Sequence, residues 1–460
     1  MSKEDKEYRL NNFRSEKIGD KVLVTTEHGE WTFLNEKEYN KLLDENVKDN
    51  FELFEDKGII VTPKNKEEVI EKTRKKYSFL YEGTSLHIII PTLRCNQKCI
   101  YCHASSKPLS CKEFDMDKKT AKRTVDFIFQ SPSENIAIEF QGGEPLIKYD
   151  LIKYIIKYAK KKNEKYNKNL DFVIVTNFAY IDEEKLDYFE KEGVDICTSL
   201  DGPKKLHEYN RNEGTYDRVA EWIDKVNEIE EMGGAHAVPT ITKESLKYPK
   251  KIVDEYVKRN LEEIHLRFLN NLGNARENWE KISYSPEEFI KFWKEAVDYI
   301  IKVNKEGNYL QEKSCHVILK KLFGDDPRYL DLQSPCGAVI GQLVYNYNGD
   351  IYTCDEGRMV EDDIFKLGNV SENDYKEITT CDKSCNVIAS SINDTTICDS
   401  CAFKPYCGLC PVCNFAEQGN ILGKVPSSSR CKILKYQFEY IFSKLLDDGD
   451  AKEVFMSWLS

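Results

Sequence analysis

The sequence predicts an α/β protein in which a partial barrel lies between a small α+β domain and a cysteine-rich domain. Three observations predict this class. Strand and helix patterns alternate six times in the middle of the chain, 16 cysteines fall largely in two regions, and 460 residues suffice for two or three cores. We expect domain ranges of 1–78, 79–300 and 301–460.

The first range has the pattern of a winged-helix-like α+β unit. Val22–Thr26 and Trp31–Leu34 flank a His-Gly turn, as in a hairpin, and Asn35 is placed to cap a helix. A strand is expected at Gly58–Val61, and Lys64–Lys76 reads as a charged helical linker. A stabilising N-terminal cap is the simplest role for such a unit.

The middle of the chain has the periodicity of a parallel sheet with right-handed crossovers. Helical patterns such as 117–130 and 149–164 separate the strands, and six units suit a partial barrel. The expected strands are 85–91, 135–140, 171–176, 194–199, 236–241 and 263–269. Barrel-like folds carry their chemistry on loops at the C-terminal strand ends.

The loop after the first strand carries three cysteines, Cys95, Cys99 and Cys102. Three thiolates can hold three irons of a cubane cluster, which leaves the fourth iron open for a small molecule. A structural zinc site would want a fourth ligand, and Cys111 is the candidate. Iron–sulfur and zinc interpretations both remain at this point.

Later strand ends carry further polar and glycine-rich groups. Paired glycines let a ligand approach the backbone, although a turn or a helix cap explains each group taken alone. These groups are Gly142, Gly143 and Glu144 after the second strand, Thr176 and Asn177 after the third, and Ser199, Asp201 and Arg211 after the fourth.

The C-terminal region contains a second set of cysteines, beside a hairpin turn at Asn348-Gly349. Two zinc-ribbon-like knots would explain part of this pattern but would leave the first cysteine loop unexplained. We expect Cys381 and Cys385 to bind nothing. The set comprises Cys336, Cys354, Cys398, Cys401, Cys407, Cys410, Cys413 and Cys431.

Composition limits the cellular context. The net charge of −12 argues against nonspecific binding to nucleic acid or anionic membranes. There is no apolar run of about 18 residues and no signal-peptide core at the start. We expect a cytoplasmic protein with no nucleic-acid or membrane partner, whose thiols are reduced and available to bind metal.

The spacing Cys-x3-Cys-x2-Cys, with Tyr101 before the last cysteine, resembles the signature of radical S-adenosylmethionine (SAM) enzymes. The resemblance implies a radical SAM barrel with a SAM-binding [4Fe–4S] cluster on Cys95, Cys99 and Cys102. It also implies that Arg211 pairs with the SAM carboxylate. The SAM-binding set would be Tyr101, Gly142, Gly143, Glu144, Thr176, Asn177, Ser199, Asp201 and Arg211.

The C-terminal cysteines resemble the SPASM extension, which carries two auxiliary [4Fe–4S] clusters. The usual Cys-x3-Cys is replaced here by Cys407-x2-Cys410, with Cys413 close by. By this resemblance the first auxiliary cluster takes Cys336, Cys354 and Cys410, with Cys413 as the candidate fourth ligand. The second takes Cys398, Cys401, Cys407 and Cys431. Three clusters are therefore expected.

Longer phrases, among them Ser85–Gln97, Ile138–Leu146 and Leu266–Ala275, are similar to the SPASM maturases of His-Xaa-Ser peptide systems. This resemblance implies an enzyme that uses a 5′-deoxyadenosyl radical to crosslink or oxidise a ribosomally made precursor peptide. Its N-terminal domain would bind the leader as an added strand, at Val22–Thr26 or Gly58–Val61. A flavodoxin or ferredoxin would donate low-potential electrons.

Two other functions compete with this one. A sulfatase-activating enzyme that makes formylglycine shares the SPASM motifs, and a noncatalytic iron–sulfur electron carrier belongs to a different class. In sulfatase-activating enzymes a Cys-Asp pair supplies a carboxylate that accepts a substrate proton. Asp355, after Cys354, is the corresponding catalytic candidate here, and a solvated turn is the alternative.

Overall fold

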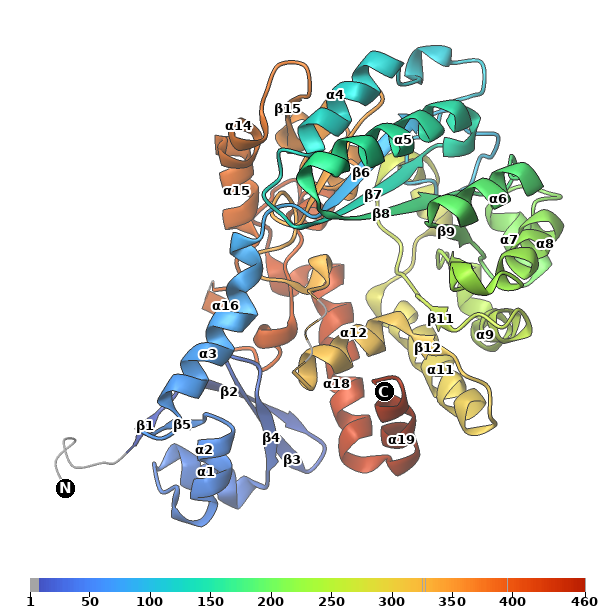
Figure 1. The fold of residues 1–460 in the computed structure, drawn as a ribbon. Helices are drawn as coiled ribbons and strands as arrows, with labels where there is room; N and C mark the ends of the chain where they lie inside the picture. The colour runs from blue at the N-terminus through green and yellow to red at the C-terminus, as the bar shows by residue number, and fades with distance from the viewer. Residues whose placement is uncertain (1–7, 325, 327, 395, 460) are drawn as a thin grey trace.

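The chain folds into a sheet-and-helix body with a small domain at one end (Figure 1). The N-terminal domain lies apart from the main sheet, and the last helices of the chain return toward it. These helices, α18 (Ser429–Asp447) and α19 (Gly449–Ser457), pack against α11 (Pro286–Lys305). The computed structural model describes residues 8–324, 326, 328–394 and 396–459.

The N-terminal domain is an antiparallel three-stranded sheet covered by helices. Its strands lie in the order β2 (Phe13–Ile18), β3 (Lys21–Thr26), β4 (Trp31–Leu34). The helices are α1 (Glu36–Leu43), α2 (Phe51–Asp56) and α3 (Lys66–Tyr77), and β1 (Arg9–Leu10) pairs with β5 (Ile60–Val61). The predicted cap is confirmed: Asn35 accepts from the Glu38 N–H, and the Glu38 carboxylate accepts from the Asn35 N–H.

The order of these strands corrects the expected docking edge. β3 is the central strand because it pairs with β2 on one side and with β4 on the other. Val22–Thr26 therefore offers no free edge for an added strand. Ile60–Val61 pairs with β1 on one side only, so Gly58–Val61 stays a prediction. β4 is an outer strand of this sheet. β2 was not predicted, because charged residues such as Arg14 and Lys17 interrupt its apolar positions.

The middle of the chain forms the expected parallel sheet. Alternate residues of the second strand, Ile136, Ile138 and Phe140, are fully buried in the core that the helices share, whereas Ala137 and Glu139 face the other side. The parallel strands are β6 (Leu86–Thr92), β7 (Asn135–Gly142), β8 (Asn169–Val175), β9 (Val194–Ser199) and β10 (His236–Val238). The accompanying helices are α4 (Lys118–Ile128), α5 (Tyr149–Tyr166), α6 (Glu183–Glu192), α7 (Lys204–Asn210), α8 (Tyr216–Asn227) and α9 (Pro249–Lys258).

The sixth strand is much shorter than the expected 263–269. It is regular only as β11 (Glu263–Ile264), which pairs in parallel with β12 (Gln311–Glu312). A single bridge between Thr240 and Arg267 links its extension to the segment after β10. Because the ladder is interrupted here, the barrel is open along this side.

The C-terminal domain shares the main sheet. β13 (Gln342–Tyr345) pairs in parallel with β6, and β14 (Asp350–Tyr352) and β15 (Lys366–Asn369) continue the sheet to eight strands. The hairpin predicted at Asn348-Gly349 thus extends the barrel sheet at its first strand. The remaining helices are α10 (Trp279–Ile282), α12 (Lys313–Leu322), α13 (Asp355–Met359), α14 (Tyr375–Thr380), α15 (Asp382–Ser390), α16 (Thr396–Asp399) and α17 (Pro411–Gln418).

Polar and aromatic contacts fix the N-terminal domain to this body. The Trp31 indole donates to the Leu322 carbonyl at 2.8 Å, and its ring meets Phe442 edge-on at 5.3 Å. The Thr25 hydroxyl donates to the Ala402 carbonyl at 2.7 Å. In the part of the chain that the structure describes, no helix combines the length and apolarity needed to cross a membrane.

Candidate active site and cysteine centres

The loop after β6 gathers three thiols at the C-terminal end of the sheet. The Cys95 N–H donates to the Lys107 carbonyl at 2.9 Å, and the Cys102 N–H donates to the Cys99 carbonyl at 3.1 Å. Burial raises the pKa of Cys95 to about 11 and that of Cys99 to about 12, and the neighbouring Cys102 thiol adds to both shifts. The three predicted ligands thus lie together in a partly buried pocket.

The two glycines after β7 press against this loop. A Cβ on Gly142 would lie 2.3 Å from the Thr92 carbonyl oxygen, and one on Gly143 would lie 2.2 Å from that of Arg94. The backbone closes the contact, since the Gly143 N–H donates to Thr92 at 2.9 Å and the Glu144 N–H donates to Arg94 at 2.8 Å. The glycines are therefore required to hold the cysteine loop against the sheet.

Glu144 organises the strand ends beside the glycines. Its buried carboxylate accepts from the Thr176 hydroxyl at 2.8 Å, the Asn177 N–H at 2.8 Å and the Leu146 N–H at 2.9 Å. Burial raises its pKa to about 7 in spite of these donors. The Asn177 amide donates to the Asn96 side chain at 3.0 Å. Glu144, Thr176 and Asn177 thus form one network that reaches the cysteine loop.

A second buried network joins the other predicted residues. The Tyr101 hydroxyl donates to Asp201 at 2.8 Å and accepts from Arg211 Nε at 2.8 Å, while Arg211 Nη1 donates to Gln97 at 3.2 Å. Asp201 also accepts from the Thr240 N–H at 3.0 Å. Arg211 is thereby held beside the cysteine loop. Ser199, the last residue of β9, lies at the same edge of the sheet, opposite Val238 of β10.

Asp355 lies at the start of α13 and is buried. It is bound by Arg358, whose Nη2 and Nε donate to one carboxylate oxygen at 2.9 and 3.2 Å. Arg358 also donates to the Ala104 carbonyl at 3.3 Å, just past the cysteine loop. A solvated turn is therefore wrong for Asp355, because its carboxylate sits in a buried ion pair between the loop and the C-terminal domain.

Glu139 is a carboxylate that sequence reasoning missed. It lies on the face of β7 that the helices do not cover, and burial raises its pKa, with the nearby Asp355 and Glu356 carboxylates adding to the shift. Its side chain accepts from Gln141. The alternation Ile138-Glu139-Phe140 was the available signal, because it places a charge on the inner face of the barrel.

Four C-terminal thiols form a first group, called here the inner quartet: Cys336, Cys354, Cys410 and Cys413. Cys354 caps α13 by accepting from the Gly357 N–H at 3.2 Å, and Cys410 caps α17 by accepting from the Cys413 N–H at 3.4 Å. The Cys413 thiol donates to Cys410 and lowers its pKa, while burial and the charge of Cys410 raise the pKa of Cys336. The structure brings all four predicted ligands together.

Four more thiols form the outer quartet: Cys398, Cys401, Cys407 and Cys431. Burial raises the pKa of Cys398 to about 11, and the neighbouring Cys431 adds to the shift. Burial likewise raises the pKa of Cys407 to about 12, with Cys401 as the main neighbouring contribution. Cys431 lies in the first turn of α18, where its N–H donates to the Ser428 hydroxyl at 3.2 Å.

The thiols described here fall into one group of three and two groups of four. Within the residues described, no three His, Cys, Asp or Glu side chains converge closely enough to hold one metal ion. In a cubane each thiolate binds its own iron, so cluster ligands need not meet at a point.

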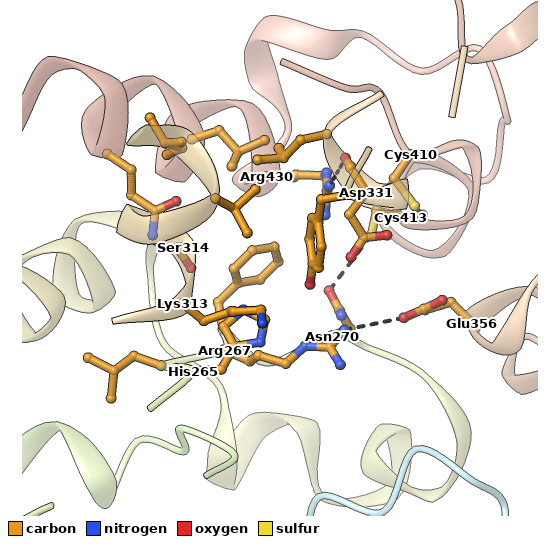
Figure 2. Close-up of a pocket in the computed structure, with 18 residues that line it drawn as sticks. His265, Arg267, Asn270, Lys313, Ser314, Asp331, Glu356, Cys410, Cys413 and Arg430 are labelled. Carbon is orange, nitrogen blue, oxygen red and sulfur yellow. Dashed lines mark hydrogen bonds and ion pairs between the residues drawn. The ribbon is translucent and has the colours of Figure 1, made fainter. Parts of the chain in front are cut away.

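A cavity connects the open side of the barrel with the inner quartet (Figure 2). The extension of β11 contributes Arg267, which pairs with Glu356 at 3.3 Å. The turn that follows, Gly273–Asn278, contacts the cysteine loop: the Ala275 N–H donates to the Cys102 carbonyl at 3.0 Å. Polar lining residues that the sequence did not single out are His265, Arg267, Asn270, Asp331, Glu356 and Arg430.

Comparison with known families decides the identity of these domains. Residues 89–253 match the model of the Radical SAM superfamily, and residues 336–402 match SPASM, an iron–sulfur cluster-binding domain. The chain has a radical SAM fold and a SPASM domain. The predicted fold class is confirmed. The protein is a radical SAM enzyme with oxidoreductase-type chemistry, and its cofactors are SAM and [4Fe–4S] clusters.

Known proteins resemble the radical SAM and SPASM domains over most of their length. A cysteine-type anaerobic sulfatase-maturating enzyme of Clostridium novyi (strain NT) is 25% identical over 361 residues, 76% of this chain and 93% of that protein. The structure of native anSMEcpe with AdoMet and the Cp18Cys peptide has a TM-score of 0.67 and 22% identity, covering 80% of this chain and 99% of its own. Streptococcus suis SuiB bound to precursor peptide SuiA has a TM-score of 0.56 and 16% identity, covering 90% and 98%. The His-Xaa-Ser subfamily stays a prediction.

Proposed function

We propose that this enzyme crosslinks or oxidises a ribosomally made precursor peptide through a substrate radical. The N-terminal domain carries the proposal, because it adds an edge strand beside a groove to the radical SAM and SPASM domains. The SuiB structure, solved with a precursor peptide, covers 90% of this chain, against 80% for anSMEcpe. A precursor peptide bound to a protein of similar fold supports a peptide substrate here.

The chain's own residues prepare the SAM site. When bound, the reduced cluster and SAM supply a 5′-deoxyadenosyl radical that removes hydrogen from an unactivated C–H bond. Arg211 is held by Tyr101 and Gln97 with its forked donors beside the cysteine loop, as required to pair with the SAM carboxylate. The Gly142–Glu144 turn and Thr176-Asn177 support the site for the methionyl amino group, and Ser199 and Asp201 border the ribose site.

The two quartets would hold two auxiliary clusters, which makes three clusters in the enzyme. The inner quartet contains both Cys410 and Cys413, so the altered spacing supplies the third and fourth ligands of that centre. The outer quartet contains Cys398, Cys401, Cys407 and Cys431. Four thiolates on each cubane leave no open iron, which suits electron transfer rather than SAM binding.

The groove beside β4 is the proposed leader site. The Thr26 N–H donates to the Glu30 carbonyl at 2.9 Å in the hairpin. Strand alternation then turns the N–H groups of Thr32 and Leu34 toward β3 and leaves those of Trp31 and Phe33 on the outer edge. An extended leader can pair with this edge. The groove is both apolar and basic, so a leader with hydrophobic and acidic residues fits it. Its lining includes Trp31, Phe33, Lys57, Lys72, Lys75, Phe323, Tyr406, Leu445 and Lys452.

Loss of a proton completes the proposed reaction after hydrogen abstraction and departure of an electron. Asp355 is the proposed proton acceptor, at the junction of the cysteine loop and the SPASM domain. Its ion pair with Arg358 orients the carboxylate. Glu139, on the inner face of β7, is the second carboxylate in this region, and its raised pKa favours proton uptake.

Formation of formylglycine on a sulfatase is the second candidate function. The similarity to the Clostridium novyi enzyme and the Cys354-Asp355 pair favour it. A domain with a free strand edge would be unnecessary for that reaction. The two candidates therefore differ in whether the N-terminal domain is needed for turnover.

Co-expression with a candidate precursor, such as a short open reading frame beside the gene, tests the proposal. Mass spectrometry should show loss of hydrogen mass from the peptide core, and 5′-deoxyadenosine should accompany it. A sulfatase-derived peptide offered in parallel should remain unchanged. Conversion of the sulfatase peptide, with no change in the precursor, would contradict the proposal and support formylglycine formation.

A further inference from the structure

Arg430 occupies the junction between the two cysteine quartets. It lies in the first turn of α18, immediately before Cys431 of the outer quartet. In space it lines the cavity of Figure 2 together with Cys410 and Cys413 of the inner quartet. One side chain is thus adjacent to the outer quartet along the chain and to the inner quartet across the cavity.

The guanidinium of Arg430 is fixed but has an unused donor. Its Nη2 donates to the Asp331 carbonyl at 2.7 Å, which sets the position of the group. Its Nε is buried and has no hydrogen-bond partner within the described residues. A buried N–H without an acceptor is costly, so an acceptor that belongs at this place is expected.

The backbone brings the two quartets close around this side chain. Gly408 lies between Cys407 of the outer quartet and Cys410 of the inner one. A Cβ at Gly408 would lie 2.6 Å from the carbonyl oxygens of both Asp331 and Gln333. The segment that connects the quartets therefore rests directly on the segment that holds Arg430.

We infer that Arg430 is a positioning residue that raises the reduction potentials of the auxiliary clusters, the inner one most. Its charge and its free Nε–H would both act on a cluster held by Cys336, Cys354, Cys410 and Cys413. A cluster becomes more negative on reduction, so a nearby buried cation and an N–H donor to sulfur stabilise the reduced form. The inner cluster thereby becomes a better electron acceptor. The inference rests on the auxiliary clusters of the proposed function.

Lys435, one turn further along α18, provides a matched control. Its side chain is 45% exposed and pairs with Glu16 at 3.4 Å and Glu439 at 3.6 Å. Its charge acts on Cys401 and Cys431 of the outer quartet, and water, salt and the two carboxylates weaken it over longer distances. Removing a charge at Lys435 therefore tests whether any cation on this helix has the same effect as Arg430.

The test is a redox titration of the fully reconstituted enzyme, followed by electron paramagnetic resonance, for wild type, R430Q, R430K and K435Q. Iron content is measured on each sample. R430Q should shift the midpoint of the inner cluster to lower potential with full iron content. R430K, which keeps the charge but loses the Nε–H, should give a smaller downward shift, and K435Q should leave the midpoint of the inner cluster at the wild-type value.

The outcomes separate this inference from the proposed function. Wild-type midpoints in R430Q and R430K at full iron content would overturn the role of Arg430 while leaving three clusters in place. If R430Q does not take up its full iron content, the midpoint of the inner cluster in R430K is the test. A midpoint lower than wild type supports the inference, and an unchanged midpoint overturns it. Wild-type protein with iron for a single cluster would contradict the cluster assignment itself.

Discussion

The cysteine loop of the barrel and the quartets of the SPASM domain use the same ligand in two different ways. The loop supplies three thiols and surrounds them with hydrogen-bonding groups such as Glu144, Asn177 and Arg211. The inner and outer quartets supply four thiols each, and Cys354 and Cys410 of the inner quartet cap helices through their sulfur atoms. The first set is one thiol short of the four that a cubane can take, and each of the other sets has all four.

This difference shows how the number of thiol ligands can separate substrate activation from electron transfer. An incomplete thiol set beside polar groups binds and activates a small molecule, whereas a complete set passes electrons. The cavity of Figure 2 borders the inner quartet at Cys410 and Cys413, and Glu356, the residue after Asp355, also lines it.

Removing the three thiols of the cysteine loop should have the largest effect, because it removes one of the two kinds of centre compared above. Changing Cys95, Cys99 and Cys102 together to Ala should remove about a third of roughly 12 irons and abolish SAM cleavage. The auxiliary clusters should persist, because no quartet contains a loop residue. Iron analysis and chromatography of 5′-deoxyadenosine check this. Retained SAM cleavage would show that another site activates SAM.

A change at the β4 edge should separate peptide processing from SAM cleavage. Phe33→Pro removes one outer N–H, while Phe33→Ala keeps it and removes the same ring. Processing should fall at least tenfold in the proline variant relative to the alanine variant, with SAM cleavage equal in both. We prefer this pair to deletion of residues 1–62, since Thr25 bonds Ala402 beside the outer quartet. Equal processing by the two variants would rule out strand addition at β4.

Changing the inner carboxylates should affect a later step. Asp355→Asn should retain iron and 5′-deoxyadenosine formation but lose most of the modified peptide, because the proton acceptor is gone. Glu139→Gln is the matched comparison on the inner face of β7. Mass spectrometry of the peptide gives the yields. Suppose the Asp355 variant gives the full yield of modified peptide and the Glu139 variant does not. Glu139, and not Asp355, would then be the proton acceptor.

The smallest expected effect concerns the contact between the barrel and the C-terminal domain. His87 on β6 bonds the Tyr345 hydroxyl on β13 at 2.8 Å, and burial lowers its pKa to about 3. Between about pH 6.5 and pH 3, His87 binds a proton in the unfolded chain but not in the folded chain. The free energy of unfolding therefore falls as the pH falls, by about 1.4 kcal/mol per pH unit. His87→Gln should flatten this slope in unfolding measurements from pH 6.5 to 5.5. An unaltered slope in His87→Gln would contradict the assignment.

The sequence was sufficient for features that depend on local spacing. The strand ends carry Cys95, Gly142, Thr176 and Ser199 at successive loops, and the parallel order then brings them to one edge. Asn35 was recognisable as a helix cap because a capping box is a local pattern. Such features follow from chain order and short-range chemistry.

Long-range pairing explains most of what the sequence did not reveal. Nothing local indicates that β13 joins β6 or that β3 is central in its sheet, because edges depend on partners far along the chain. Arg430 reads as an ordinary charged residue of α18 until Asp331 and Cys413 are placed beside it. The β11 extension was expected as a strand, since apolar residues that line a cavity resemble strand residues in pattern.

The most direct test of the account is one anaerobic experiment on the reconstituted wild-type protein. Metal content is measured first, and the protein is then reduced and incubated with SAM and the neighbouring precursor peptide. We predict roughly 12 irons per chain, formation of 5′-deoxyadenosine and loss of hydrogen mass from the peptide. Stoichiometric zinc without iron, and no 5′-deoxyadenosine, would contradict the central claim.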